Sequence, residues 1–308
     1  MKKYDIIVVG AGPAGISAAL AAHESGIRSI IVLDRLPSPG GILSQCLHRG
    51  FGKNGLNGIE YADELMRSVA VAGIEVRQDS TVTGLSADGV VTVFGDGKIY
   101  RLRGAAVVLA TGARERPAGS LGIAGTRPAG VFTAGSVQRM INLHGYKLGN
   151  SAVILGSGDV GMIVAHHLTQ TDVQVIGVFE KERYSSGLSR NKRLYLDSNN
   201  IPLFYETTVT ELHGVGRLCA VTVCRVGADG VPMPETGRVI ECDTLVTSVG
   251  LIPERELISE MQGGAEKAPE WLFVCGNAGQ IYSLVEKVAK DGFDVGTAAA
   301  EFLAIHRG

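Results

Sequence analysis

One glycine pattern occurs twice in this sequence, each time after an apolar run. The first copy, G-A-G-P-A-G at residues 10–15, follows the run 6–9, and the second, G-S-G-D-V-G at residues 156–161, follows the run 152–155. Such a run is typical of a strand buried in a parallel sheet, and G-x-G-x-x-G is typical of the turn from that strand into a helix. The repeat therefore predicts two strand–turn–helix units in one chain.

Each position of the pattern has a mechanical reason. The first glycine permits a tight turn, the second lets the backbone approach a pyrophosphate, and the third lets helix and strand pack closely. The following helix offers unpaired N–H groups and a positive dipole end to phosphate oxygens. An acid follows at the same offset in both copies, Asp34 after Gly10 and Glu180 after Gly156, where it can accept hydrogen bonds from a ribose. Two such units in register predict two nucleotide cofactors.

The remaining segments are arranged around these units. The loop 35–55 is long and contains Gly40, Gly41, Cys46 and His48, which indicates a segment that lines a cofactor. Alternating patterns predict antiparallel β inserts at 80–102 and at 208–226 with 238–241. Further strands are predicted at 74–77, 105–113, 244–249 and 272–276, and helices at 59–73, within 114–149 and at 283–306.

Composition excludes several classes of protein. Hydrophobic residues make up 45% of the 308 residues and the net charge is −2, so the chain has no general attraction to nucleic acid or acidic membranes. No apolar run reaches the roughly 18 residues of a membrane span, and Asp5 interrupts the apolar N-terminus, so we expect a cytoplasmic protein. The five cysteines form no C-x-x-C and no cluster with histidine, which predicts neither a metal site nor a disulfide framework.

The motifs together resemble the flavoproteins with two dinucleotide-binding domains, in particular the thioredoxin-reductase branch. The motifs that carry the resemblance are Gly10–Gly15, Ala110-Thr111-Gly112, Gly156–Gly161, Ser248-Val249-Gly250 and Val274-Cys275-Gly276-Asn277. Within that branch, LSQCLHRGFG, ATGARERP, GVFTAGSVQRMIN and ILGSGDVGMIVA are similar to the small or alpha flavoprotein subunits of sarcosine, opine and proline dehydrogenase-like complexes. Related subunits accompany glycerol-3-phosphate-dehydrogenase-like flavoproteins.

The resemblance implies an α/β fold with two Rossmann-like, three-layer ββα domains. The second would be inserted in the first, and each would carry a small antiparallel β insert. The implied FAD-binding domain comprises 1–113 and 251–308, and the implied NAD(P)H-binding domain comprises 114–250.

The resemblance also implies which residues bind each cofactor. The FAD set is Gly10, Gly12, Pro13, Ala14, Gly15, Asp34, Arg35, Gly41, Val82, Ala110, Thr111, Gly112, Gly276 and Asn277. The NAD set is Gly156, Gly158, Asp159, Gly161, Glu180 and Gly250. The family usually has Asp where Asn277 stands, and an Asn can accept one hydrogen bond and donate another.

Glu180 bears on the choice of nicotinamide cofactor. A carboxylate there accepts hydrogen bonds from a free 2′-hydroxyl and repels a 2′-phosphate, which favours NADH over NADPH. Lys181 and Arg183 lie close by in sequence and would weaken that preference.

The redox cysteines of the family are absent from their usual place. Thioredoxin reductases carry a C-x-x-C before the second glycine pattern, where this chain has residues 133–137, TAGSV. Electrons therefore cannot leave through an internal dithiol. Cys46 is the remaining candidate, either as a thiolate stabilised by His48 or Arg49 beside the flavin or as a buried cysteine that only packs. Gln45 and His48 are candidates to donate hydrogen bonds around the flavin.

Three functions follow from these observations. The first is an FAD-dependent oxidoreductase that passes hydride between NAD(H) and flavin and exchanges electrons with a partner or a small acceptor. The second is the electron-transfer subunit of an amine, 2-hydroxy-acid or glycerol-3-phosphate dehydrogenase complex. Its partner would be a dehydrogenase-type flavoprotein subunit or a small Cys-rich electron carrier, in a homo- or hetero-oligomer. The third is a non-catalytic nucleotide-binding redox sensor.

Overall fold

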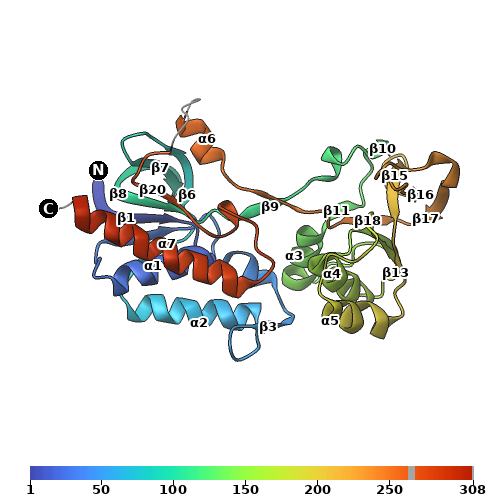
Figure 1. The fold of residues 1–308 in the computed structure, drawn as a ribbon, viewed down its shortest axis with the longest axis horizontal. Coiled ribbons are helices and arrows are strands. Elements are labelled where there is room, and N and C mark those ends of the chain that lie inside the picture. Colours follow the sequence, from blue (N-terminus) through green and yellow to red (C-terminus); the bar gives the residue numbers. More distant parts are fainter. Residues whose placement is uncertain (263–267, 307–308) are drawn as a thin grey trace. The chain divides into compact units, whose positions relative to one another are not determined.

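The chain forms two compact units in the computed structural model, which describes residues 1–262 and 268–306 (Figure 1). Unit 1 comprises residues 1–114 and 253–308, and unit 2 comprises residues 115–252. The domain limits expected from the sequence differ from these by at most two residues.

Unit 1 is built on a parallel sheet whose strand order is β5-β2-β1-β8, with β20 on the other side of β8. The bounds are β1 (Lys2–Val9), β2 (Ile30–Leu33), β5 (Glu75–Arg77), β8 (Lys98–Leu109) and β20 (Leu272–Val274). Side chains of β1 alternate between two cores, because successive residues of a strand point to opposite faces. Ile6 and Val8 pack on the helical side, whereas Ile7 and Val9 pack against β6 (Thr81–Leu85) and β7 (Val90–Gly95).

The expected β insert is present, but it is not separate from the parallel sheet. Strands β6, β7 and β8 form the antiparallel meander, and β8 continues without a break into the strand that pairs with β1. The end of the insert predicted at 80–102 and most of the strand predicted at 105–113 are therefore one strand of 12 residues. The sequence suggested two because its alternating half lies at the surface and its apolar half is buried.

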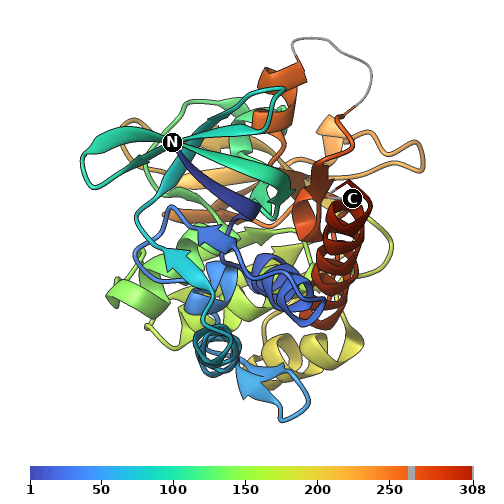
Figure 2. The same cartoon turned by 90° about the vertical axis from the view of Figure 1, so that its left-hand side faces the viewer.

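Three helices cover one face of this sheet: α1 (Pro13–Glu24), α2 (Gly58–Val71) and α7 (Val285–His306). Figure 2 shows α1 and α7 side by side. A Cβ atom on Gly292 would lie 2.8 Å from the carbonyl carbon of Ala14, and one on Gly296 would lie 2.7 Å from that of Ala18. The two helices therefore approach each other too closely for any side chain at these glycines. A capping box between Asn57 and Glu60 begins α2.

Unit 2 repeats the plan. Its parallel sheet has the order β11-β18-β12-β13-β14, and a second sheet, β10-β15-β16-β17, packs on one face. The strands are β10 (Ala124–Gly125), β11 (Val131–Thr133), β12 (Ser151–Leu155), β13 (Gln174–Phe179), β14 (Leu203–Phe204), β15 (Thr207–His213), β16 (Ala220–Arg225), β17 (Arg238–Glu241) and β18 (Thr244–Thr247). The other face is covered by α3 (Ala134–His144) and α4 (Asp159–Thr169). The predicted fold class, two three-layer α/β units with β inserts, is confirmed.

The other elements are short. They are β3 (Arg49–Phe51), β4 (Leu56–Asn57), β9 (Ala113–Glu115), β19 (Leu251–Pro253), α5 (Ser189–Asn191), a π-helical turn η3 (Lys192–Leu196), α6 (Glu256–Gln262) and the 3₁₀ turns η1 (Gly41–Gln45), η2 (Ala118–Ser120), η4 (Asp197–Asn199), η5 (Pro234–Thr236) and η6 (Gly276–Ala278). Strands β9 and β19, on the two chain crossings, form a two-stranded sheet. Among the helices of residues 1–262 and 268–306, none is long and apolar enough to cross a membrane.

Candidate cofactor sites

The first glycine pattern makes a tight turn from β1 into α1. Gly10 has φ +108°, and a Cβ there would lie 2.9 Å from the carbonyl carbon of Ala110 and closer still to its oxygen. Gly12, the residue before α1, has an extended backbone, and apart from its own chain neighbours no described residue has an atom within 4 Å of the position its Cβ would take. The first glycine is thus required by the fold, whereas the second leaves open space at a helix N-terminus, as a pyrophosphate site needs.

Asp34 stands at the end of β2 and is held by main-chain donors. Its Oδ2 accepts from the Ala11 N–H at 2.6 Å and its Oδ1 from the Leu36 N–H at 2.8 Å, and the side chain is only 7% exposed. Each carboxylate oxygen has a second lone pair. The acid therefore has a fixed orientation beside the glycine turn and retains acceptor capacity for a ribose hydroxyl.

The second glycine pattern reproduces this geometry. The N–H of Gly156 bonds the Phe179 carbonyl at 2.8 Å, as that of Gly10 bonds Leu33. A Cβ on Gly156 would lie 2.8 Å from the carbonyl carbon of Ser248, whereas one on Gly158 would come no closer than 3.7 Å to any described neighbour.

Glu180 occupies the position of Asp34 and is equally buried, at 7% exposure. Its Oε1 accepts from the Glu182 N–H at 3.0 Å, as Asp34 does from the residue two positions on. The two copies differ in one respect. Ala11 donates to Asp34 through its N–H alone, whereas Ser157 donates to Glu180 Oε2 through both its N–H (2.9 Å) and its hydroxyl (2.5 Å). Glu180 is therefore oriented more firmly than Asp34 and has one acceptor position fewer for a ligand.

Asp159 is the first residue of α4, and its carboxylate is hydrogen-bonded to the segment that follows β13. Its Oδ1 accepts from the Leu188 N–H and from Asn191 Nδ2, both at 2.8 Å. Arg183 is also engaged, since its Nε lies 3.0 Å from Glu206 Oε1. Asp159 therefore positions the segment after β13.

Several other predicted FAD residues gather at the first glycine turn. A Cβ on Gly41 would lie 3.2 Å from the Gly12 Cα, and one on Gly276 would lie 2.6 Å from the Ala14 Cβ. Asn277 Oδ1 accepts from the Tyr282 N–H at 2.9 Å. Gly15, Pro13 and Ala14 are buried in the first turn of α1. The structure thus brings Gly12, Gly41 and Gly276 to one end of the parallel sheet.

Thr111 and Gly112, which follow β8, are bonded to the returning chain crossing. Thr111 Oγ1 donates to the Glu254 carbonyl at 2.6 Å, and the Glu254 N–H bonds Gly112. Among the described residues, nothing lies within 4 Å of a Cβ placed on Gly112, and Gly250 in unit 2 is equally open. Arg35 is exposed. Val82 follows Ser80 by two positions, and the Ser80 N–H bonds the Asp34 carbonyl.

The environment of Cys46 bears on the choice between a thiolate and a cysteine that only packs. The thiol is 6% exposed, burial raises its pKa to about 12, and Sγ donates to the Ile42 carbonyl at 3.2 Å. Arg49 instead lies 3.9 Å from Glu60, and the His48 ring lies 4.9 Å from that of Phe51. Gln45 is buried. These contacts favour the packing interpretation of Cys46 over the redox interpretation.

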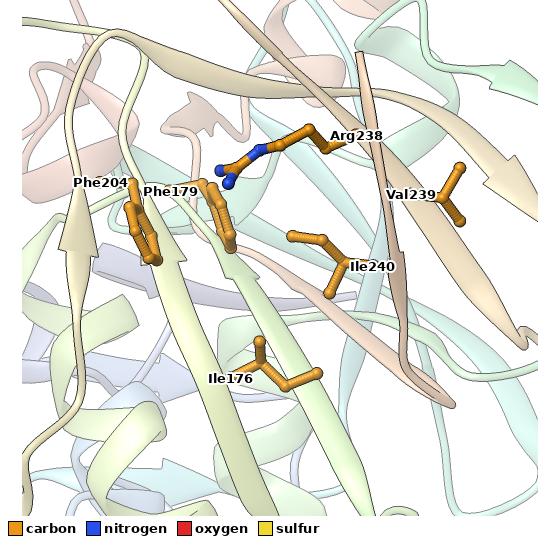
Figure 3. A pocket seen from close by; sticks show the side chains of 6 residues that line it. All are labelled: Ile176, Phe179, Phe204, Arg238, Val239 and Ile240. Atoms are coloured by element: carbon orange, nitrogen blue, oxygen red, sulfur yellow. The ribbon is translucent and has the colours of Figure 1, made fainter. Parts of the chain in front are cut away.

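Two surface pockets in unit 2 are lined by no residue of the glycine pattern. One of about 260 Å³ is lined by Ile176, Phe179, Phe204, Arg238, Val239 and Ile240, with the rings of Phe179 and Phe204 stacked 4.9 Å apart (Figure 3). It contains none of the predicted site residues. The other, of about 310 Å³, has Lys181 in its lining, the residue directly after Glu180. The candidate sites are therefore identified by backbone geometry and not by cavity volume.

Sequence reasoning missed the residues that hold these turns in place. Ser157 occupies a variable position of the glycine pattern, and Arg255 and Asp291 belong to no motif. Asp291 Oδ2 accepts from the Gly276 N–H at 2.7 Å, and Arg255 Nε donates to the Ala278 carbonyl at 2.6 Å. A search for polar residues near the end of β20 would have found Asp291 only if the fold were already known.

Two dinucleotide-binding units, each with an open second glycine and an oriented acid, define the class of two-domain nucleotide-dependent oxidoreductases. The chain belongs to the family described as pyridine nucleotide-disulphide oxidoreductase, which it matches over residues 4–270. The family uses a flavin and a pyridine nucleotide.

Comparisons with individual proteins agree with this assignment. Over 83% of its length the chain is 28% identical to hydrogen cyanide synthase subunit HcnB of Pseudomonas aeruginosa, of which it covers 58%. It is 32% identical to an opine oxidase subunit of Agrobacterium tumefaciens over 58% of its own length and 37% of that protein. The fold matches T. acidophilum thioredoxin reductase with a TM-score of 0.75 at 20% identity, covering 98% of this chain and 99% of the other. The chain thus spans about half the length of the curated relatives named here.

Proposed function

We propose that unit 1 binds FAD, that unit 2 binds NAD(H), and that the chain passes hydride between the nicotinamide and the flavin. The observation that carries the proposal is the repeated geometry of the glycine turns. In both units the first glycine abuts a neighbouring strand, the second faces open space, and a buried acid is held by main-chain N–H groups. These features fit a bound dinucleotide at each turn.

The chain itself supplies binding and orientation. N–H groups at the starts of α1 and α4 bind the pyrophosphates, and Asp34 and Glu180 bind the riboses. The bound flavin supplies the redox chemistry. The proposed electron path does not use a Cys46 thiolate, since burial raises the pKa of this thiol.

NADH is the expected nicotinamide cofactor. Glu180 has a fixed orientation and would repel a 2′-phosphate, while Arg183, a residue that could attract one, is paired with Glu206. The preference rests on the charge of Glu180 and should fall when that charge is removed.

Electrons are proposed to leave to a separate protein. No disulfide forms within residues 1–262 and 268–306, and no dithiol lies at residues 133–137. HcnB and the opine oxidase relative are both named as subunits, and both are longer than the region matched here. These facts favour an electron-transfer subunit of a larger dehydrogenase or oxidase over a stand-alone reductase.

The decisive experiment is the absorption spectrum of the purified chain before and after anaerobic NADH, repeated with NADPH. We expect a yellow protein that bleaches faster with NADH. Glu180→Gln should weaken NADH binding about tenfold or more, because a hydrogen bond to a charged group is worth about 1.5–3 kcal/mol. It should also narrow the preference over NADPH. Glu182→Gln is the matched control, since Glu182 is exposed and contributes its backbone N–H to the site.

Two outcomes would contradict parts of this proposal. A colourless protein that cannot be reconstituted with FAD would exclude the flavin. A yellow protein that neither nucleotide bleaches would exclude NAD(H) as the electron donor and leave the partner as the source of electrons.

A further inference from the structure

The turn that follows β20 is held by hydrogen bonds from three separate elements. Asp291 of α7 accepts from the Gly276 N–H, and the Tyr282 N–H donates to Asn277 Oδ1. From the segment that follows β19, Arg255 donates through Nε to the Ala278 carbonyl at 2.6 Å and through Nη2 to the Gly279 carbonyl. The guanidinium thus binds two successive carbonyl groups with its planar fork, a geometry that lysine cannot reproduce.

This turn belongs to the proposed FAD site. Gly276 lies directly against Ala14 in the first turn of α1, and the Cys275 N–H bonds the Leu109 carbonyl at the end of β8. Asn277 Oδ1 accepts from the Tyr282 N–H, which fixes the amide, and its Nδ2 is the side chain's hydrogen-bond donor. The position of residues 276–279 therefore determines where that donor points.

Arg255 also stands at a special place in the chain. Its neighbour Glu254 is hydrogen-bonded to the outgoing crossing on both sides, through its N–H to Gly112 and through its carbonyl from Thr111. Residues 254 and 255 therefore join the outgoing crossing, the returning crossing and the turn after β20.

We propose that Arg255 is a positioning residue that sets the geometry of the FAD-binding turn 276–279 from the returning chain crossing. The inference deepens the proposed function and rests on FAD binding in unit 1. Its guanidinium binds the two carbonyls of the turn, so it acts through the turn and through the direction of Asn277.

The test uses Arg255→Met and Arg255→Lys in the full chain, with Arg28→Met as the matched control. Arg28 is also exposed and also donates to a main-chain carbonyl, that of His23. Arg255→Met should weaken FAD binding about tenfold, the effect of losing one net charge-assisted hydrogen bond. It should also change the visible circular dichroism of the flavin that remains bound, which a general loss of stability would not do. Arg255→Lys should restore FAD affinity only in part.

Hydrogen exchange of the flavin-free chain provides a readout independent of cofactor. Peptides covering 275–282 should exchange faster in both Arg255 variants, while peptides of α1 in those variants and peptides 275–282 of Arg28→Met stay as in the wild type. Unchanged exchange at 275–282 would overturn the proposal, as would an Arg255→Met protein whose flavin affinity and spectrum match those of Arg28→Met. If Arg255→Met does not fold, Arg255→Lys decides by the same criteria. A chain that binds no flavin would refute the proposed function, and the exchange experiment would still decide whether Arg255 holds the turn.

Discussion

Substituting the first and second glycines of unit 1 should separate folding from cofactor binding. In Gly10→Ala the new residue would have to adopt φ +108°, a strain of about 1–3 kcal/mol for an L-residue. Its Cβ would also overlap the Ala110 carbonyl, and the Ala110 N–H is part of the β1–β8 pairing through its 2.8 Å bond to Val9. We therefore expect unit 1 to lose about 3 kcal/mol or more, since strain and overlap add.

Gly12→Ala should leave the stability of unit 1 nearly unchanged and weaken FAD binding. The backbone at Gly12 has φ −77° and ψ 179°, which alanine adopts freely, and its Cβ would meet no described atom within 4 Å. The weaker N-cap and the reduced entropy of the unfolded chain nearly cancel, so stability should change by less than about 1 kcal/mol. A methyl group in that space would keep phosphate oxygens from reaching the helix N–H groups. The loss of two such charge-assisted hydrogen bonds, at about 1.5 kcal/mol each, should weaken FAD binding roughly 100-fold.

The assay combines two measurements on the flavin-free variants. Urea-dependent hydrogen exchange of β1 peptides reports the stability of unit 1 alone, because a chain of two units need not unfold in one step. Quenching of flavin fluorescence gives the FAD dissociation constant. If the FAD dissociation constant of Gly12→Ala lies within about twofold of the wild-type value, the open space is not the pyrophosphate site. Gly10→Ala as stable as the wild type would refute the steric argument.

Three further predictions concern single side chains. Cys46→Ser should bleach with NADH at the wild-type rate, and iodoacetamide should alkylate Cys46 slowly at pH 7–8, because burial raises its pKa to about 12; rapid alkylation would contradict this. Ser157→Ala should lower the stability of unit 2 by about 1–2 kcal/mol through the lost bond to Glu180, visible as faster exchange in β12 peptides with β1 peptides unchanged. Burial alone would raise the pKa of Asp243, but N–H donors from Asn150 and Ser151 outweigh it and hold the pKa below its usual range. Asp243→Asn should therefore cost unit 2 about 1 kcal/mol at pH 7, because solvent screens this carboxylate, and the deficit should shrink as the pH falls through the lowered pKa; a deficit independent of pH would contradict the charge argument.

The sequence predicted what depends on local pattern. Gly10, Gly12 and Asp34 could be interpreted together because strand, turn and acid follow each other within one short segment, and the second copy repeated them. The strand β8 was divided in two because its exposed and buried halves have different periodicities, and only the tertiary fold shows that they are continuous.

The chemistry of single side chains was less predictable. The state of Cys46 depends on burial, and a Cβ on Gly58 would lie 2.5 Å from the Cys46 Cβ, so a residue 12 positions away closes the space around the thiol. The bonds of Arg255 and Asp291 join positions that are 15 to 24 residues apart and carry no motif. Such contacts follow from the fold and cannot be derived from neighbouring residues in the sequence.

The close approach of α1 and α7 has a consequence for the order in which the chain is assembled. Helix α1 precedes the whole of unit 2 in the chain, and α7 follows it. Domains generally fold during synthesis from the N-terminal side. Unit 2 can therefore complete its fold on the ribosome while the face of α1 around Ala14 and Ala18 still awaits its partner. Until α7 is made, that face of α1 lacks the helix that buries it in the folded unit.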